Sequence, residues 1–268
     1  MCEDFIVEAS LIPVYSDNLD GPEFNDYPLI PKGGTPLASI RKMSGAEASI
    51  ELGWTLPKET GGKVLETKFK TPRYQTGMPK GIRATDSFFD FLQELSGNDI
   101  PKKHTAARGR LVDSMVDGHK YIYGKRAVIY GEEDLVVGLT SFLAEIGIQP
   151  VLCATGGKSG LFEKSINTVL EGMPCEPPVV KEDVDFYDIE NMAKELGVDI
   201  VIGHSKGYAF ARKEDLPIIR VGFPIHDRVG GQRILHLGYQ GAQALFDLIT
   251  NTIIDKKQSD STVGYSYM

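Results

Sequence analysis

Residues 203–207 read Gly-His-Ser-Lys-Gly, the G-x-S-x-G spacing that places a nucleophilic serine on a sharp turn between a strand and a helix. Acyl-transfer chemistry at Ser205 also requires an acid and then a histidine further along the chain, and Asp227 and His236 follow in that order. Against a hydrolase, the expected sheet is too short and no HGGG-like oxyanion loop precedes the motif. The simpler interpretation is a glycine-rich loop that lets the backbone pass close to a neighbouring element.

A second polar loop follows the last expected strand, and glycines at 230 and 231 flank it. Ligands of open α/β sheets bind beyond the carboxyl ends of the strands, so we expect the two loops to converge on one edge of a sheet. Alternatively, Asp227 and Arg228 pair with each other across a subunit contact. The candidate cofactor-binding or interface residues are His204, Ser205, Lys206, His226, Asp227 and Arg228, and no residue is assigned a catalytic role.

Residues 155–160 (Thr-Gly-Gly-Lys-Ser-Gly) also follow a strand and contain the Lys-Ser pair of a phosphate-binding loop. Such a loop needs glycines at a fixed spacing before the lysine, so that backbone N–H groups can surround the phosphate. Here Ala154 stands four residues before Lys158, and the spacing is not met. A plain turn at the edge of the sheet is therefore favoured over nucleotide binding.

Asp113 and Asp117 lie four residues apart on an expected helix, so both carboxylates project from one face. Oxygen ligands of this kind suit a hard divalent cation. Arg110 is close enough to neutralise one of the two charges, and the residues by themselves favour a solvated face over a metal site.

The elements that position these residues are most regular in the second half of the chain. Strands are expected at 126–131, 149–154, 179–180, 199–203 and 217–222, and helices at 135–146, 163–170, 185–196 and 239–254. Alternation of strand and helix predicts a parallel sheet with right-handed crossovers. The expected fold class is α/β, with two open, Rossmann-like parallel-sheet domains, of which the first looks incomplete.

The first half alternates short strands with turn-rich loops. Its expected elements are a strand within 5–14, a loop at 17–22, a short helix capped by Thr35 with Pro36 at its first position, strands at 46–52 and 72–76, and helices from 85 to 97 and from 102 to 121. A chain that starts on a strand and then enters a long loop suggests that an N-terminal part of the domain is missing. The expected division is a partial α/β domain at 1–100, a linking helix at 101–124, and a C-terminal parallel α/β domain with a closing helix at 125–268.

Composition limits the partners. The formal net charge is -8 and no basic stripe is present, so nucleic acid is not an expected partner. No apolar run approaches the roughly 20 residues that span a bilayer, and the first residues are acidic rather than basic, so a cytoplasmic protein is expected. Cys2, Cys153 and Cys175 fit neither a disulfide framework nor a CxxC metal site.

Several motifs in one order resemble the nitrogenase component 1 family, most closely its β-type branch, which holds the β subunit of the molybdenum-iron protein and the related cofactor-assembly scaffold subunit. The resemblance covers nearly the whole chain. It is carried by residues 33–35, 81–86, 108–113 (Arg-Gly-Arg-Leu-Val-Asp), 117–119, 124–126, 131–135 (Gly-Glu-Glu-Asp-Leu), 202–207 and 220–228 (Arg-Val-Gly-Phe-Pro-Ile-His-Asp-Arg).

This chain also differs from the family that it resembles. Members of this branch are much longer, with three α/β domains, and their cluster-ligating cysteines lie in a first domain that this chain lacks. None of the three cysteines matches a ligand position. The resemblance therefore implies that this chain binds no cluster alone, and that an iron–sulfur cluster belongs to the assembled complex. In the β subunit, a pair matching Asp113 and Asp117 contributes to a divalent-metal site between two β chains.

The implied function is that of a subunit, inactive alone, of a nitrogenase-like oxidoreductase of nitrogen fixation or of a scaffold for iron–sulfur cofactor assembly. Its implied partners are an α-type subunit, a second copy of itself and a reductase component. A non-catalytic assembly module is the alternative, and a hydrolase using Ser205 is the least favoured. On this interpretation, residues 204–207 and 226–228 face a partner subunit or a bound cofactor.

Overall fold

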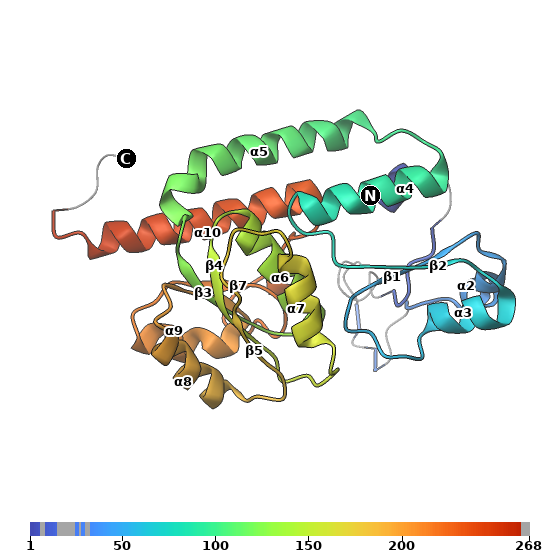
Figure 1. The fold of residues 1–268 in the computed structure, drawn as a ribbon. Helices are drawn as coiled ribbons and strands as arrows, with labels where there is room; N and C mark the ends of the chain where they lie inside the picture. Colours follow the sequence, from blue (N-terminus) through green and yellow to red (C-terminus); the bar gives the residue numbers. More distant parts are fainter. Residues whose placement is uncertain (6–8, 15–24, 27, 30–32, 264–268) are drawn as a thin grey trace. The chain divides into compact units, whose positions relative to one another are not determined.

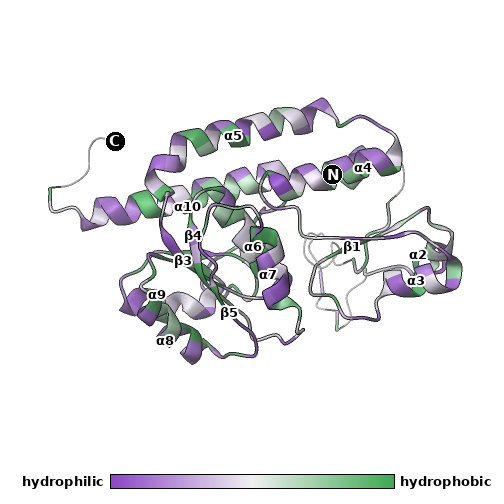
Figure 2. Ribbon diagram, viewed as in Figure 1, coloured by the Kyte–Doolittle hydropathy of each residue, from purple (hydrophilic) through white to green (hydrophobic). Residues whose placement is uncertain are grey.

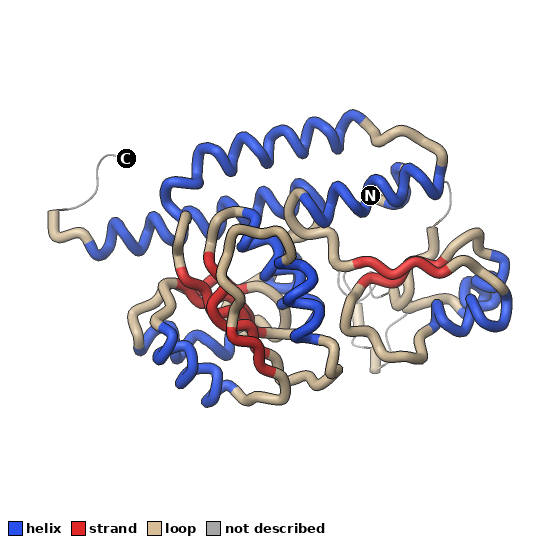
Figure 3. The backbone as a smooth tube through the Cα atoms, viewed as in Figure 1, coloured by secondary structure: helices blue, strands red, loops and turns tan. Residues whose placement is uncertain are grey.

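The computed structural model describes residues 1–5, 9–14, 25–26, 28–29 and 33–263. The chain divides into two compact units. The smaller unit comprises residues 1–52 and 57–76, and the larger unit comprises residues 53–56 and 77–268. Figure 1 labels the elements of both units, and Figure 3 shows the central strands of the larger unit flanked by helices.

The larger unit contains a five-stranded parallel sheet with the order β5-β4-β3-β6-β7. Its strands are β3 (Arg126–Tyr130), β4 (Gln149–Ala154), β5 (Val179–Lys181), β6 (Ile200–Gly203) and β7 (Ile218–Arg220). The chain builds outward from β3 to β5, then returns to the other side of β3, so the strand order reverses between β3 and β6. The expected parallel α/β architecture is confirmed for this unit.

The central strands are buried on both faces, which accounts for their nearly continuous apolar sequence. On one face, Val128, Leu152 and Val201 pack against α8 (Phe186–Leu196) and α9 (Tyr208–Lys213). On the other face, α6 (Glu133–Glu145) packs against β3 and β4, and α7 (Phe162–Leu170) packs on α6. Helices on both faces place the connecting loops, and therefore the candidate residues, at the carboxyl edge of the sheet.

Two long helices, α5 (Lys102–Ile122) and α10 (Gly238–Asp260), lie side by side (Figure 1). The predicted inward residues of α10 are buried: Ala242, Leu245, Phe246 and Ile249. The helix continues six residues beyond the predicted end at Ile254, because its last turns are solvated and held by the Lys256–Asp260 ion pair at 2.5 Å. Both helices carry hydrophilic and hydrophobic residues (Figure 2), and in the described part of the chain no helix is long and apolar enough to cross a membrane.

Helix α4 (Arg83–Ser96) begins two residues before the predicted cap at Thr85. The carboxylate of Glu145, at the end of α6, accepts the N–H groups of Ile82 and Arg83 at 2.7 and 2.8 Å. A distant side chain thus satisfies N–H groups that a helix start leaves free. The helix ends at Gly97 as predicted, with φ of 69°.

Helices α4 and α5 (Lys102–Ile122) both belong to the larger unit. Asp86 on α4 accepts two N–H groups of the Arg108 guanidinium on α5, at 2.8–3.1 Å, and the Tyr239 hydroxyl on α10 at 2.5 Å. This shared carboxylate joins the three helices.

The smaller unit contains two parallel strands, β1 (Ser49–Leu52) and β2 (Arg73–Thr76), as predicted at this place. The helix between them, α3 (Gly61–Phe69), is absent from the prediction, and the Thr60 hydroxyl caps it by accepting the N–H of Lys63 at 3.1 Å.

Two predictions for the start of the chain are wrong. Residue 5 and residues 9–14 form no strand, and the remainder of that predicted strand, residues 6–8, lies outside the described residues, as does the predicted loop at 17–22. The short helix α2 (Leu37–Lys42) has Pro36 as its N-cap, because the Thr35 hydroxyl instead accepts the N–H of Val14 at 3.0 Å.

Candidate functional site

The two polar loops expected at the carboxyl edge of the sheet meet there. The Ser205 hydroxyl donates to Oδ1 of Asp227 at 2.9 Å and accepts the backbone N–H of His226 at 2.8 Å. The backbone N–H of Ser205 donates to the carbonyl of Pro224 at 3.0 Å. Ser205 therefore fastens the turn after β6, η3 (Ser205–Gly207), to the loop after β7.

Asp227 is bound most strongly by Arg220, the last residue of β7. The guanidinium Nε donates to both carboxylate oxygens at 2.9 and 2.8 Å, and Nη2 lies 2.7 Å from Oδ2. These bonds, together with that from Ser205, lower the pKa of Asp227 to about 2. Arg228 adds a longer ion pair at 3.7 Å. The carboxylate is thus held charged between two cations and a hydroxyl.

His204 caps the turn that follows it. Its Nδ1 accepts the N–H of Lys206 at 3.4 Å, and the edge of its ring meets the Tyr130 ring with centroids 4.9 Å apart. Burial, and secondarily the nearby Lys206 charge, lower the pKa of His204. The side chains of Lys206, His226 and Arg228 are exposed on the outer surface of the loops.

Tyr130, at the end of β3, fills the place where the strand order reverses. Its hydroxyl donates to the carbonyl of His204 at 2.6 Å, and burial raises the pKa of Tyr130. Glycine is required around it: a Cβ on Gly203 would lie 2.5 Å from the Tyr130 carbonyl, and one on Gly207 would overlap the phenol oxygen. On the β7 side, a Cβ on Gly222 would overlap the Leu135 side chain. The crevice in which doubly wound sheets commonly bind ligands is therefore occupied by side chains of this chain.

The Ser205 motif does not assemble a hydrolytic relay. Among the described contacts of Ser205, its hydroxyl meets the Asp227 carboxylate directly, with no histidine ring between them. The ring of His236 lies instead against the side-chain nitrogen of Lys80. A nucleophilic serine needs an imidazole to accept its proton, and Ser205 has none at hydrogen-bond distance in this part of the chain.

The loop at 155–160 has its backbone N–H groups directed at carboxylates. Ser159 N–H donates to Glu133 at 3.0 Å, Gly160 N–H donates to Glu182 at 2.9 Å, and the Lys158 ammonium pairs with Asp183 at 2.6 Å. A phosphate would require these donors to be free, and the surrounding charges would repel it. The geometry agrees with a turn.

Asp113 and Asp117 are exposed on α5. The opposite side of α5 packs on α10, where Gly118 leaves room for the Phe246 ring and Ser114 accepts a hydrogen bond from Gln243 at 3.0 Å. Within the described residues, no group of three or more His, Cys, Asp or Glu side chains is arranged to hold a metal ion. These two aspartates can contribute to such a site only together with ligands from elsewhere.

Sequence reasoning did not single out Tyr130 and Arg220 as members of this site, although both lie at ends of strands that it predicted. The signal for Tyr130 is the glycine pair at 203 and 207, which leaves space for a large neighbour.

Comparison with known proteins decides the family. Residues 2–254 match the family model described as nitrogenase component 1 type oxidoreductase. The chain belongs to this family.

Its relatives include molybdenum-iron protein β chains. That of Clostridium pasteurianum is 35% identical over 252 residues, which are 94% of this chain and 55% of the relative. That of Methanococcus maripaludis is 34% identical over 256 residues, 93% and 54% of the two chains. A solved structure titled nitrogenase Cp1 at pH 6.5 superposes with a TM-score of 0.86 at 35% identity, covering 92% of this chain and 54% of that one. The chain spans about half the length of the curated relatives it matches.

The cysteines of this nitrogenase component 1 chain do not form an iron–sulfur ligand set. Cys153 is fully buried in β4, contacts the Thr140 hydroxyl at 3.1 Å, and has a pKa raised to about 12 by burial. Cys2 belongs to the smaller unit and Cys175 to the loop before β5, and burial raises the pKa of both. A cluster needs several converging thiolates, which these three residues do not supply.

Proposed function

We propose that this chain is a β-type subunit of a nitrogenase-like complex and that it works as a structural partner rather than as the holder of the cluster. The observation that carries the proposal is the arrangement of the site: Tyr130 closes the crevice of the sheet, and Ser205, Asp227 and Arg220 are bound to one another. Such a set makes a rigid surface and engages the Ser205 hydroxyl with a carboxylate and a backbone N–H rather than with an imidazole.

The outer side of the two loops supports a contact with a partner subunit. Phe223 and Val229 expose 68% and 99% of their surface beside the exposed cations Lys206 and Arg228. Large apolar side chains rimmed by charge, mounted on a rigid base, are typical of protein interfaces. In the proposed complex the partner at this surface is an α-type subunit.

The exposed face of α5 supports a second contact, with another copy of this chain. Val112 and Val116 are exposed large apolar residues on one face of α5, next to the two aspartates, and Tyr123 is exposed at the C-terminal cap of the helix. We propose that Asp113 and Asp117 bind a divalent cation jointly with ligands of the neighbouring copy. Hard oxygen ligands of this kind suit Ca²⁺ or Mn²⁺.

Co-expression with an α-type subunit tests the proposal. Light scattering during size-exclusion chromatography should show a hetero-oligomer for the wild type. Val229→Asp should weaken it, because the substitution places a charge in the apolar part of the contact. Val263→Asp is the matched control, since Val263 is also 92% exposed but lies beyond the end of α10. If both variants assemble with the α-type subunit equally well, these loops are not part of the interface.

Anaerobic iron and sulfide analysis tests the absence of a cluster in the isolated chain. The proposal expects iron and sulfide in the hetero-oligomer and none bound stoichiometrically to the isolated chain. Turnover of the complex with a reductase component then indicates an oxidoreductase, whereas transfer of its cluster to another protein indicates an assembly scaffold. A complex without cluster would support a non-catalytic assembly module.

A further inference from the structure

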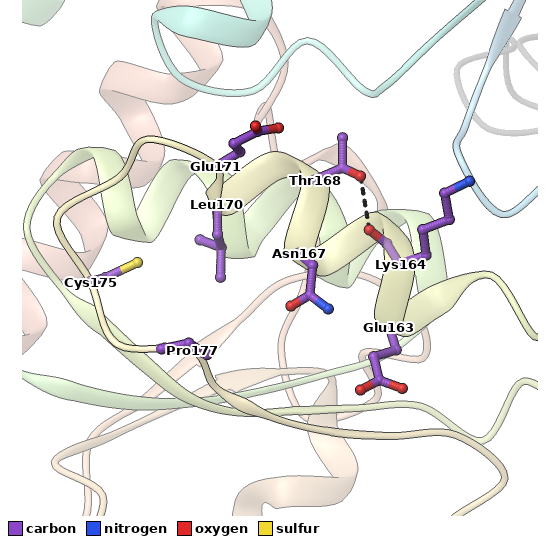
Figure 4. A pocket seen from close by; sticks show the side chains of 8 residues that line it. All are labelled: Glu163, Lys164, Asn167, Thr168, Leu170, Glu171, Cys175 and Pro177. Atoms are coloured by element: carbon purple, nitrogen blue, oxygen red, sulfur yellow. Dashed lines mark hydrogen bonds between the residues drawn. The ribbon is translucent and has the colours of Figure 1, made fainter.

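Two cavities open on the larger unit. An acidic one, of about 420 Å3, lies at the carboxyl edge of β3 and β4, where Glu132 and Glu133 accept backbone N–H groups at 3.2 and 3.0 Å. The other, of about 590 Å3, lies between α7 and the loop before β5, with Leu170 and Asn167 directed toward Pro177 (Figure 4). Neither lining, in the residues that the structure describes, holds a group that selects a ligand. The interior beside α6, in contrast, holds a buried pair of bases.

Helix α6 anchors the two segments that lead to and from the smaller unit. Residues 53–56 follow β1, and residues 77–82 follow β2 and lead to α4. Asp134, at the start of α6, accepts two N–H groups of the first segment at 2.6 and 3.1 Å. Glu145, at the other end of α6, accepts N–H groups where the second segment enters α4. A few side chains of the larger unit thus hold both segments.

Lys80 lies in the middle of the second segment and is only 2% exposed. Its methylene groups pack over Gly138 of α6, where a Cβ would lie 2.9 Å from Cδ. Its Nζ is in direct contact with Nδ1 of His236, in the loop before α10. Beside this contact, the N–H of Gly238 donates to the carbonyl of Pro79 at 2.8 Å. The segment is therefore joined to α6 and to the start of α10 at one place.

The contact between Lys80 and His236 joins two bases. An N–H of the lysine can donate to Nδ1 of a neutral imidazole, whether the lysine is charged or not. A second proton, on the imidazole, would place two buried cations against each other. The opposite charge that acts on Lys80 is Glu132, and this carboxylate already accepts two N–H groups at the start of α6. The pair can therefore remain in contact with one proton but not with both.

Two further carboxylates lie on helices that meet this segment, and both are engaged with other groups. Glu145 on α6 accepts the N–H groups at the start of α4. Asp86 on α4 accepts the Arg108 guanidinium and the Tyr239 hydroxyl. Neither carboxylate is among the groups that change the pKa of Lys80 or of His236. A second proton on the pair would thus be poorly balanced.

The direction of the pKa changes agrees with this geometry. Burial lowers the pKa of Lys80 from 10.5 to about 7, and burial together with the Lys80 charge lowers that of His236 from 6.5 to about 4. Release of either side chain into water restores its ordinary pKa, so release takes up a proton. For His236 this applies between about pH 6.5 and pH 4. Within this range, each fall in pH favours the released form.

We propose that the contact between Lys80 and His236 is an acid-sensitive latch for residues 77–82. Protonation of both bases drives them apart and frees the segment from the start of α10. One of the two attachments of the smaller unit to the larger unit is then loosened, while the sheet of the larger unit stays folded. This inference is independent of the proposed function, because it concerns contacts within the larger unit alone.

Hydrogen exchange of the purified chain, measured by mass spectrometry from pH 7.5 to pH 5 and corrected for the intrinsic effect of pH on exchange, tests the inference. In the wild type, protection of residues 78–81 and 237–240 should fall about tenfold or more between pH 7 and pH 5, because release of His236 takes up a proton over most of this range. Strand β4 should keep its protection. Loss of protection in β4 at the same pH would mean global unfolding and would overturn the proposal.

Variants of the two bases identify the group responsible. His236→Asn retains an acceptor for Lys80 but cannot be protonated in this range, so protection of the two segments should become nearly independent of pH between 7 and 5. His226→Asn, at an exposed histidine, is the matched control and should retain the wild-type dependence. Circular dichroism establishes that each variant is folded. The proposal is also overturned if the wild type shows no dependence on pH at these amides, or if His236→Asn shows the same dependence as the wild type.

Discussion

The guanidinium group of Arg220 binds the carboxylate of Asp227 through Nε, at 2.9 and 2.8 Å from the two oxygens, with Nη2 2.7 Å from Oδ2. The two residues lie at the end of β7 and in the loop that follows it. Because Ser205 bonds to the same carboxylate, this ion pair also holds the turn after β6. One carboxylate thus sets the positions of two loops on the proposed interface.

The Asp227 carboxylate makes stability depend on acid pH. Its pKa is lowered from 3.8 to about 2, chiefly by Arg220, so its contribution is fully present above the unfolded value and is lost as pH falls from about 4 to about 2. Asp227→Asn should lower the melting temperature at pH 6. Between pH 4 and pH 2 the melting temperature of this variant should fall by less than that of the wild type. Differential scanning calorimetry across this range measures both effects. Asp188→Asn, at an exposed position of α8, is the control. If the melting temperature of the Asp227 variant falls as much as that of the wild type, the assignment to Asp227 is contradicted.

Tyr130 and Gly207 should be energetically coupled. A Cβ at Gly207 would overlap the Tyr130 hydroxyl, so Gly207→Ala should destabilise the wild type by about 1–3 kcal/mol, the usual cost of overpacking. In a Tyr130→Ala background the same substitution should cost much less. Urea unfolding of the four proteins of this cycle gives the coupling energy. Additive effects would show that the tyrosine does not fill this space in solution.

Glu145 should contribute to the stability of α4 although it belongs to α6. Glu145→Ala removes the acceptor of two N–H groups at the start of α4, and a lost cap of this kind costs about 1–2 kcal/mol. Hydrogen exchange measured by mass spectrometry should show faster exchange at residues 82–86 than in the wild type. Glu163→Ala, on α7, should leave that exchange unchanged. Unaltered protection in the Glu145 variant would mean that α4 is held by packing alone.

Lys80 should make stability depend on alkaline pH. Burial lowers its pKa from 10.5 to about 7, so between these values the unfolded chain binds a proton that the folded chain does not. Stability should therefore rise as pH increases from about 7 towards 10.5. Lys80→Met should abolish this rise, and Lys164→Met, at an exposed lysine, should retain it. Thermal unfolding from pH 7 to pH 9.5 provides the measurement, and an unchanged slope in the Lys80 variant would contradict a neutral buried lysine.

The two aspartates on α5 should link metal binding to self-association. Sedimentation velocity with and without Ca²⁺ or Mn²⁺ should show more dimer of this chain, or of its complex, when the cation is present. Asp113→Asn with Asp117→Asn should remove the effect of the cation. Asp90→Asn, at an exposed position on α4, is the control. A cation effect that survives the double substitution would place the metal elsewhere.

The sequence was sufficient for the regular part of the fold. Strands such as β4, predicted and observed at Gln149–Ala154, are buried on both faces and therefore appear as continuous apolar runs. Helix α10 was recognised because Leu245 and Ile249 repeat at helical spacing. It also identified the two loops that meet at the sheet edge, since parallel strands end at the same edge.

Other features depend on groups far apart in the chain. The start of α4 is set by Glu145, 62 and 63 residues later, and the place of Asp227 is set by Arg220 and by Ser205, 22 residues away. In the sequence, Glu133 stands before the helix expected at 135–146, and only the structure places its carboxylate beneath Gly157 as a buried group.

By itself, the sequence determined the order of strands and helices from β3 to α10, the parallel sheet they form and the family, because periodicity and local motifs are properties of neighbouring residues. Only the tertiary structure decided which polar groups of the two loops bond to one another, that Tyr130 closes the crevice, and that an acidic cavity remains beside β4. Those outcomes depend on packing and hydrogen bonding through space, which the spacing of residues along the chain does not encode.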